Sequence, residues 1–227
     1  SLFQACASRM QGDGFLAPMV LTNSDFRFVV TEQLMAAGID PGPVLIEPNG
    51  RKTAPAVLAA ALSLQASDPD AIMLVAPSDH VVPDVQGFQE AVAEGLRAVV
   101  EDRRLVTFGI TPHHPETGYG YLELETKPTG SGEAIELRRF VEKPDMQTAS
   151  KMIANGNFLW NAGIFLFAAA DIIKAFETHA PNLVGPVRAA VENAETDLGF
   201  QRLDSDAWQD VEDISIDYAV MEKTNNL

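Results

Sequence analysis

A carboxylate and an imidazole directly follow an apolar run in the first half of the chain. The run Met73–Ala76 leads through Pro77 to Ser78, Asp79 and His80. A carboxylate at the end of a strand can hold Mg²⁺, which prefers oxygen ligands and is often bound by one or two carboxylates together with substrate phosphate. The same residues also suit an ordinary turn or helix cap. The residue types alone leave both interpretations of Asp79 open.

A second polar segment, Glu47–Ala56 (EPNGRKTAPA), follows another short apolar run. Gly50 lets a backbone approach a ligand closely. Arg51 and Lys52 come just before an Ala- and Leu-rich helical pattern, and the N-terminus of a helix favours anions. A solvated loop before a capped helix is the alternative, but the coincidence of a strand end with a helix start slightly favours an anionic ligand.

Two further segments combine glycine, aromatic and charged residues. Gly118 and Gly120 flank Tyr119, so they either admit a flat or hydroxylated ligand or begin a tight hairpin. Glu142 and Lys143 end an alternating strand, where the carboxylate suits sugar hydroxyls and the ammonium suits a phosphate. Pairing of the two side chains is the alternative, although neighbours on a strand point to opposite faces.

Asn161 lies inside the apolar and aromatic run Phe158–Phe167. A buried amide needs hydrogen-bond partners, which can be backbone groups or a ligand. The sequence therefore predicts that Asn161 has partners, and it leaves their identity open.

The elements that must position these residues alternate along the first half of the chain. Apolar runs predict strands at 18–22, 43–46, 71–77 and 104–110, and helical periodicity predicts helices at 25–38, 53–66 and 87–100. Asn23 or Ser24 is expected to cap the first helix, Gly38 to end it, and Thr53 to cap the second. This order predicts an α/β, Rossmann-like fold: a mostly parallel mixed sheet with helices on both faces. Ligands of such sheets bind outside the carboxyl ends of the strands, where Asp79 is expected.

The second half of the chain changes character. Alternating residues predict strands at 120–125 and 134–144 with a turn-rich link at 126–132 between them. A helix at 145–155, the strand 158–167 and a helical stretch at 169–193 that breaks at Pro181 follow. Because no linker or repeat divides the chain, we expect a single domain over residues 1–227.

Composition limits the classes of ligand and compartment. Asp plus Glu number 32 against 16 Lys plus Arg, which gives a net charge of −16 and argues against a nucleic-acid partner. The one cysteine, Cys6, cannot form an internal disulfide and fits a reducing compartment. No run approaches the roughly 18 apolar residues of a membrane span. We therefore expect a soluble, cytoplasmic protein that acts without a membrane.

Six segments, taken in order, carry a resemblance over essentially the whole chain: EPNGRKTAPA, LVAPSDHVV, TGYGYLE, FVEKPD, FLWNAGIFLF and SIDYAVMEK. Together they resemble the bacterial mannose-1-phosphate guanylyltransferases, or GDP-mannose pyrophosphorylases, which are nucleotide-diphospho-sugar pyrophosphorylases. The resemblance implies that the phosphate oxygen of mannose 1-phosphate attacks the α-phosphorus of GTP, so that pyrophosphate leaves and GDP-mannose forms. Mg²⁺ is the implied cofactor, with positioning and charge neutralisation as the protein's part. Whether the chain forms a homodimer stays open.

The same resemblance implies roles for individual residues. Asp79 is implied as the Mg²⁺ ligand, and Asp79 and Lys143 as catalytic residues. The implied nucleotide-binding residues are Glu47, Gly50, Arg51, Thr53, Ala54, Pro55, Ala56, Pro77, Ser78 and Asp79. The implied sugar-phosphate-binding residues are Gly118, Tyr119, Gly120, Glu142, Lys143, Asn161 and Gly163. No role follows for His80.

The chain departs from the family pattern in three places. A glycine-rich loop with Arg and Lys would precede Ser1, and a second metal-binding Asp would follow SIDYAVMEK. The domain is therefore expected to lack its N-terminal phosphate loop and its C-terminal part. Lys52 stands where the family more often has Asn or another small polar residue, which leaves the detail of base recognition open.

Two alternative functions remain beside the implied one. The first is a related pyrophosphorylase for another nucleoside triphosphate or hexose 1-phosphate. The second is a non-catalytic paralogue that senses sugar nucleotides. A glycine-rich Arg/Lys loop upstream of Ser1 would favour an enzyme, and its absence from the natural protein would favour the sensor.

We expect residues 1–227 alone to make little or no GDP-mannose from GTP and mannose 1-phosphate. The reason is the missing phosphate loop and second Mg²⁺ carboxylate, which would neutralise phosphate charge. Pyrophosphate release by this fragment checks the expectation, and measurable synthesis contradicts it.

Overall fold

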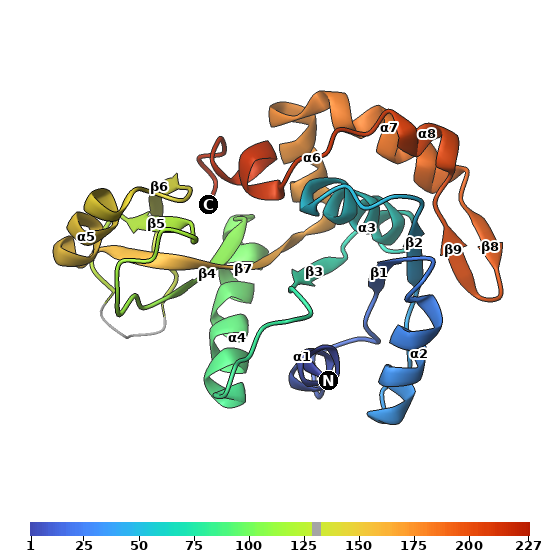
Figure 1. Cartoon of the computed structure of the whole chain (residues 1–227), viewed down its shortest axis with the longest axis horizontal. Helices are drawn as coiled ribbons and strands as arrows, with labels where there is room; N and C mark the ends of the chain where they lie inside the picture. Colours follow the sequence, from blue (N-terminus) through green and yellow to red (C-terminus); the bar gives the residue numbers. More distant parts are fainter. Residues whose placement is uncertain (129–132) are drawn as a thin grey trace.

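One long strand, β7 (Phe158–Ala168), organises the larger sheet of the computed structural model, which describes residues 1–128 and 133–227. β7 pairs antiparallel with three strands: β3 (Ile72–Val75), β4 (Val106–Ile110) and β5 (Tyr121–Leu124). β5 pairs in turn with β6 (Leu137–Val141), again antiparallel. Figure 1 shows β7 crossing much of the molecule, from α5 at one end to α6 at the other.

The register of these pairs fixes the position of each strand beside β7. Phe165 and Leu166 lie opposite residues of both β3 and β4, so these two strands flank β7 on opposite edges. Trp160 likewise lies opposite residues of both β4 and β5, so β5 shares the edge of β3. β3 and β4 therefore run parallel to each other with β7 inserted between them.

A smaller sheet has the order β1-β2-β9-β8. β1 (Val20–Asn23) pairs with β2 (Val44–Glu47), and β2 with β9 (Phe200–Arg202), both in parallel. β9 pairs antiparallel with β8 (Glu195–Asp197). Glu47 is thus the last residue of a strand in the parallel part of this sheet.

Helices cover both sides of the sheets (Figure 1). They are α1 (Leu2–Arg9), α2 (Arg27–Ala36), α3 (Thr53–Ser67), α4 (Val85–Asp102), α5 (Met146–Asn155), α6 (Ala169–His179), α7 (Pro181–Glu192), α8 (Ser205–Gln209) and the π-helix η1 (Asp217–Met221). Phe165 and Phe167 of β7 pack with the cluster of α3, α6 and α7, whereas Ile164 and Leu166 pack with that of α4. This alternation follows from the two-residue period of a strand buried on both faces.

The structure confirms the α/β class and the helices on both faces, and it corrects the pairing. Of the seven pairings between described strands, two are parallel and five antiparallel, so the expected mostly parallel sheet is wrong. The expectation rested on strands that are apolar on both faces. An antiparallel strand inserted between helix-covered neighbours, as β7 is, gives the same pattern. β3 is also not fully buried, because Ile72 is 40% exposed.

Several expected element ends are confirmed and two helix caps are wrong. α2 ends before Gly38, whose φ is +72°, and Pro181 begins α7. The α2 cap is Phe26, because the Asn23 side chain instead accepts a hydrogen bond from the Asp25 amide. Thr53 is the first residue of α3 rather than its cap. Residues 129–132 of the expected link lie outside the described residues.

Among the described residues, no helix combines the length and the apolar composition needed to cross a membrane.

Candidate functional site

The loop after β3 carries Asp79 and is held by hydrogen bonds from α1. The Cys6 thiol donates to the Pro77 carbonyl at 3.2 Å, and Arg9 Nη2 donates to the His80 carbonyl at 3.0 Å. Both α1 residues are buried, so the loop ends are fixed while Asp79 itself is exposed. Within the described part of the chain, no hydrogen bond or ion pair engages the Asp79 carboxylate. It is therefore free to meet a ligand.

The loop between β2 and α3 is held by the segment that follows β9. Trp208 Nε1 donates to the Asn49 carbonyl at 2.8 Å, and Arg51 Nη2 donates to the Gln209 carbonyl at 3.2 Å. Lys52 pairs with Asp213 at 3.6 Å, so this cation is partly neutralised. A Cβ at Gly50 would meet nothing within 4 Å, which leaves open space beside that residue.

The residues expected at the nucleotide differ in how far they reach the surface. Thr53 is exposed and Ala56 is half-buried, whereas Ala54 and Pro55 are buried against the core. The Ala54 amide donates to the Ile214 carbonyl at 3.1 Å. Ala54 and Pro55 therefore support the loop with their side chains turned into the protein.

Glu47 is the acid with the most perturbed environment in this loop. Burial raises the pKa of its carboxyl from 4.5 to about 7. Its Oε1 atom is buried and has no hydrogen-bond partner among the described residues. An unpartnered buried oxygen is costly, so Glu47 is suited to a ligand that brings hydrogen-bond donors.

A second group of predicted residues surrounds Gly120. The Tyr119 carbonyl accepts a hydrogen bond from the Lys143 amide at 3.2 Å, and the Gly120 carbonyl accepts one from the Asn161 amide at 2.8 Å. A Cβ at Gly120 would lie 2.7 Å from Glu142 Oε2 and 2.9 Å from the Phe140 ring, so a glycine lets both side chains lie over the backbone here. Gly118 belongs to the same loop, where its amide donates to Glu116 Oε1.

Glu142 and Lys143 form an ion pair of 3.0 Å, the alternative that strand geometry had made less obvious. β6 ends at Val141, and Lys143 has a φ of +44°, so the chain has turned out of the strand before the two side chains meet. The hydrogen bond and charge of Glu142 raise the pKa of the Lys143 ammonium.

The side chain of Asn161 is held on three sides. Its Oδ1 atom accepts from the Gly163 amide at 3.1 Å and from Thr107 Oγ1 at 3.1 Å. Its Nδ2 atom donates to Asp217 Oδ1 at 3.1 Å. Asn161 is half-buried rather than buried. The partners of its amide are a backbone group and two side chains, and one Nδ2 hydrogen is left for a ligand.

Two contacts connect these groups. A Cβ at Gly163, whose φ is +65°, would lie 3.8 Å from Pro77 Cγ, so the Asp79 loop lies against the segment that follows Asn161. On the other side, the Ile216 amide donates to Thr53 Oγ1 at 2.9 Å, one residue before Asp217. The structure therefore brings together the loops that carry the predicted nucleotide-binding residues and the predicted sugar-phosphate-binding residues, which are called the two half-sites below.

Asp217 is the residue of this region that the sequence analysis missed. Its segment, SIDYAVMEK, was recognised without a role for the aspartate. Burial and then the charge of Glu142 raise the pKa of the Asp217 carboxyl, against the hydrogen bond from Asn161. The signal available in the sequence was an acid just before the apolar run Ala219–Met221.

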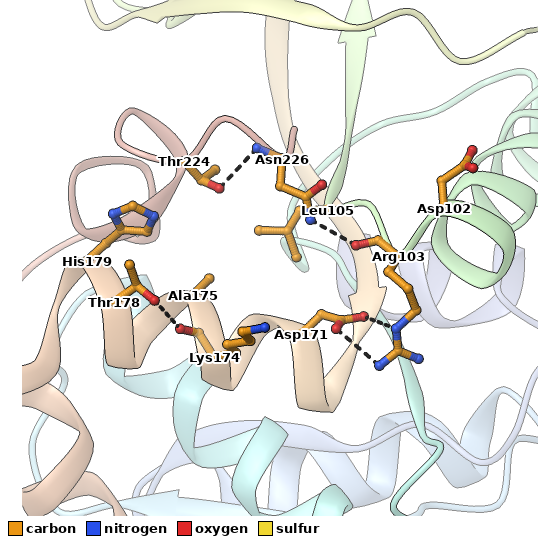
Figure 2. A pocket seen from close by; sticks show the side chains of 10 residues that line it. All are labelled: Asp102, Arg103, Leu105, Asp171, Lys174, Ala175, Thr178, His179, Thr224 and Asn226. Atoms are coloured by element: carbon orange, nitrogen blue, oxygen red, sulfur yellow. Dashed lines mark hydrogen bonds and ion pairs between the residues drawn. The ribbon is translucent and has the colours of Figure 1, made fainter.

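Two cavities lie outside the group around Asn161. The first, of about 310 Å³, opens between the end of α4, α6 and the chain end (Figure 2). Its polar lining is largely satisfied internally: Arg103 binds Asp171, and Asn226 donates to the Arg103 carbonyl. The second, of about 290 Å³, borders Pro48 but contains none of the predicted site residues. Neither cavity includes Asp79, Glu142 or Asn161.

A metal ion at this site would need ligands from a bound substrate as well as from the protein. Among residues 1–128 and 133–227, no group of three or more His, Cys, Asp or Glu side chains gathers closely enough to hold a metal ion. Mg²⁺ is often held by one or two carboxylates plus substrate phosphates. The exposed Asp79 carboxylate fits that arrangement, in which the substrate completes the metal's ligands.

Comparison with known proteins gives consistent matches. A family model described as Nucleotidyl transferase matches residues 1–225. The chain is 43% identical over 224 residues to the xanthan biosynthesis protein XanB of Xanthomonas campestris, covering 99% of this chain and 47% of that protein. It is 41% identical over 228 residues to a mannose-1-phosphate guanylyltransferase of Sinorhizobium fredii, covering 100% of this chain and 44% of that protein. The chain thus spans about half the length of these relatives.

Among solved structures, the chain is similar to a crystal structure titled mannose-6-phosphate isomerase, from Helicobacter pylori. The TM-score is 0.87 at 28% sequence identity, and the match covers 100% of this chain and 86% of that one. The whole described fold therefore has a counterpart in a solved protein.

Replacing Glu47 with Gln should stabilise the protein at high pH and leave it unchanged at low pH. Between pH 4.5 and about 7 the folded protein keeps a proton on Glu47 that the unfolded chain loses. Stability therefore falls as pH rises through this window, and glutamine removes the loss. We expect the variant to gain about 2 kcal/mol at pH ~8, after allowance for solvent screening.

Urea unfolding of both proteins at pH ~4 and pH ~8 measures this difference. Glu101→Gln, a substitution of an exposed acid on α4, is the matched control. An equal gain at both pH values contradicts the assignment of the effect to the Glu47 proton.

Proposed function

This chain belongs to the nucleotidyl transferase family, and on that premise we propose that it makes GDP-mannose and pyrophosphate from GTP and mannose 1-phosphate. The name of the Sinorhizobium fredii relative supports this choice of substrates. The observation that carries the proposal is the convergence of the Asp79 loop, the Glu142–Lys143 pair and Asn161.

The nucleotide half of the proposed site lies at the carboxyl ends of β2 and β3. Glu47 is assigned to the guanine. That base presents neighbouring N–H donors on one edge, which match the unpartnered Oε1 of Glu47. Adenine presents a donor beside an acceptor on the corresponding edge and cannot satisfy a carboxylate in the same way. Open space beside Gly50 leaves room for a base or ribose to approach the backbone.

The phosphates are assigned to the exposed surface between the two halves. Asp79, which has no internal partner, is the residue that would hold Mg²⁺ together with phosphate oxygens. When bound, this ion neutralises charge that develops on the transferring and leaving phosphates. Arg51, in the loop before α3, is assigned to the same side because its guanidinium suits phosphate geometry.

The hexose half is assigned to Tyr119, Gly120, Glu142 and Asn161. The Glu142 carboxylate accepts hydrogen bonds from sugar hydroxyls, and the remaining Nδ2 hydrogen of Asn161 donates to another hydroxyl oxygen. Gly120 has no side chain that would fill the space beside Glu142. Lys143 provides the cation for the sugar phosphate.

The proposed reaction needs little covalent work from the protein. One phosphate oxygen of mannose 1-phosphate forms a bond to the α-phosphorus of GTP, and the bond from that phosphorus to the β-phosphate bridging oxygen breaks. Pyrophosphate carries away the electron pair, so no proton transfer through a side chain is required. The residues act by holding the two phosphates in line and by offsetting their mutual repulsion.

The test of this function is the rate of product formation by the full-length natural protein that contains this chain. We expect GDP-mannose from GTP and mannose 1-phosphate, with ATP, UTP and other hexose 1-phosphates at least tenfold slower in kcat/KM. A preference for another pair of substrates moves the protein to a related pyrophosphorylase. Isomerisation of mannose 6-phosphate, measured in parallel, tests the activity named for the Helicobacter pylori structure, and isomerisation without nucleotide transfer contradicts the proposal.

Replacing Asp79 with Ala in the full-length protein should lower the rate of Mg²⁺-dependent turnover by about a hundredfold or more, because it removes an oxygen ligand at the phosphates. Initial rates over a range of Mg²⁺ concentrations measure the loss. Asp70→Ala, a substitution of an exposed acid just before β3, is the control. Turnover retained by Asp79→Ala removes Asp79 from the metal role.

A further inference from the structure

One half-buried carboxylate, that of Asp217, lies where the two proposed half-sites meet. It contacts Asn161 on one side, and its neighbour Ile216 is bound to Thr53 at the start of α3 on the other. None of the roles proposed above uses it.

The hydrogen bonds of Asn161 show how Asp217 acts on the orientation of the Asn161 side-chain amide. The Gly163 amide is a donor, so the Asn161 atom that faces it must be the oxygen. The opposite atom is then the nitrogen, and the Asp217 carboxylate accepts from it at 3.1 Å. Without an acceptor at position 217, the Asn161 nitrogen would lose its internal partner, and only the hydrogen bonds to the Asn161 oxygen would hold the side chain.

The backbone around Asp217 holds its carboxylate in place. Asp217 begins the π-helix η1, whose Ala219, Val220 and Met221 are at most 1% exposed. π-helical turns are rare and are frequent at functional sites. The segment just before η1 is tied to α3 twice, by the Ile216 amide on Thr53 and by the Ala54 amide on the Ile214 carbonyl.

The charge around Asp217 argues against a simple structural pair. The charge of Glu142 raises the pKa of Asp217, and burial with the charges of Glu142 and Asp217 raises that of Glu222. Lys143 faces Asp217 with its ammonium already paired with Glu142, and Lys223 is the cation that acts on Glu222. An excess of carboxylates at one place costs stability, and a fixed Asn161 amide is the evident gain.

We propose that Asp217 is a positioning residue of the hexose half-site: its carboxylate orients the Asn161 amide so that the second Nδ2 hydrogen faces the substrate. This inference rests on the proposed function, because the substrate it positions is mannose 1-phosphate. It assigns Asp217 no direct contact with the substrate.

Kinetics of Asp217 variants of the full-length protein test the proposal. Asp217→Ala should raise KM for mannose 1-phosphate about tenfold or more, with KM for GTP changed less than about twofold. Asp217→Asn should stay within about threefold of wild type, because its amide oxygen still accepts from Asn161. Asp210→Asn, which removes an exposed acid seven residues upstream, is the matched control.

A double-mutant comparison separates action through Asn161 from any other effect. In an Asn161→Ala background, Asp217→Ala should add no further rise in KM for mannose 1-phosphate, since the group it positions is gone. An additive effect overturns the proposal. So does an equal rise of both KM values, an unchanged KM for mannose 1-phosphate in Asp217→Ala, or an Asp217→Asn variant as impaired as Asp217→Ala.

A readout without turnover keeps this inference separate from the proposed function. In ¹⁵N-labelled protein, the Asn161 side-chain amide signal is the one lost in Asn161→Ala. Its hydrogens should exchange slowly in wild type and about tenfold faster or more in Asp217→Ala. Unchanged exchange overturns the positioning role even where the enzyme makes GDP-mannose. A protected amide in a protein that makes none contradicts the proposed function alone.

Discussion

The backbone pairing of β7 is the constraint on which the site depends. Its residues Asn161 and Gly163 are predicted site residues, and two of its partner strands lead to others. β3 leads into the Asp79 loop, and β5 follows directly on Gly120. Because Tyr121 lies opposite Val141, the antiparallel register of β5 and β6 places Gly120 beside Glu142. A slip of one residue in this register would separate the pair and turn every side chain to the other face.

The positions of most helices and strands follow from local sequence, but the strands and side chains that lie beside them do not. Helical periodicity located α3, and the apolar run 158–167 located β7 to within one residue. Periodicity reports how many faces of an element are buried, but not which strand lies beside it. The antiparallel insertion of β7 between β3 and β4 was therefore missed. Asn161 was expected to need partners, yet Thr107 and Asp217 lie more than fifty residues away in the chain, beyond any local pattern.

The loop before α3 shows what residue type alone does not reveal about predicted site residues. Arg51 and Lys52 suggested two cations for an anion, and the fold commits one of them to Asp213. Ala54 and Pro55 belong to the same motif, yet their side chains face the core. Glu47, by contrast, has a property that its residue type does not show: burial at a strand end raises the pKa of its carboxyl to about 7. Spacing identified the loop, and only burial distinguishes its supporting residues from those that can meet a ligand.

In the proposed hexose half-site, the Glu142–Lys143 ion pair would favour ligands that carry both hydroxyls and a phosphate. A phosphate alone must compete with Glu142 for the Lys143 ammonium and must approach a group of carboxylates. A sugar alone meets Glu142 while Lys143 still occupies one of its oxygens. A hexose phosphate does both at once: its hydroxyls donate to Glu142, and its phosphate takes over Lys143, so that the cost of separating the pair is offset on each side. A ligand with only hydroxyls or only a phosphate would therefore separate the Glu142–Lys143 pair less readily than a hexose phosphate.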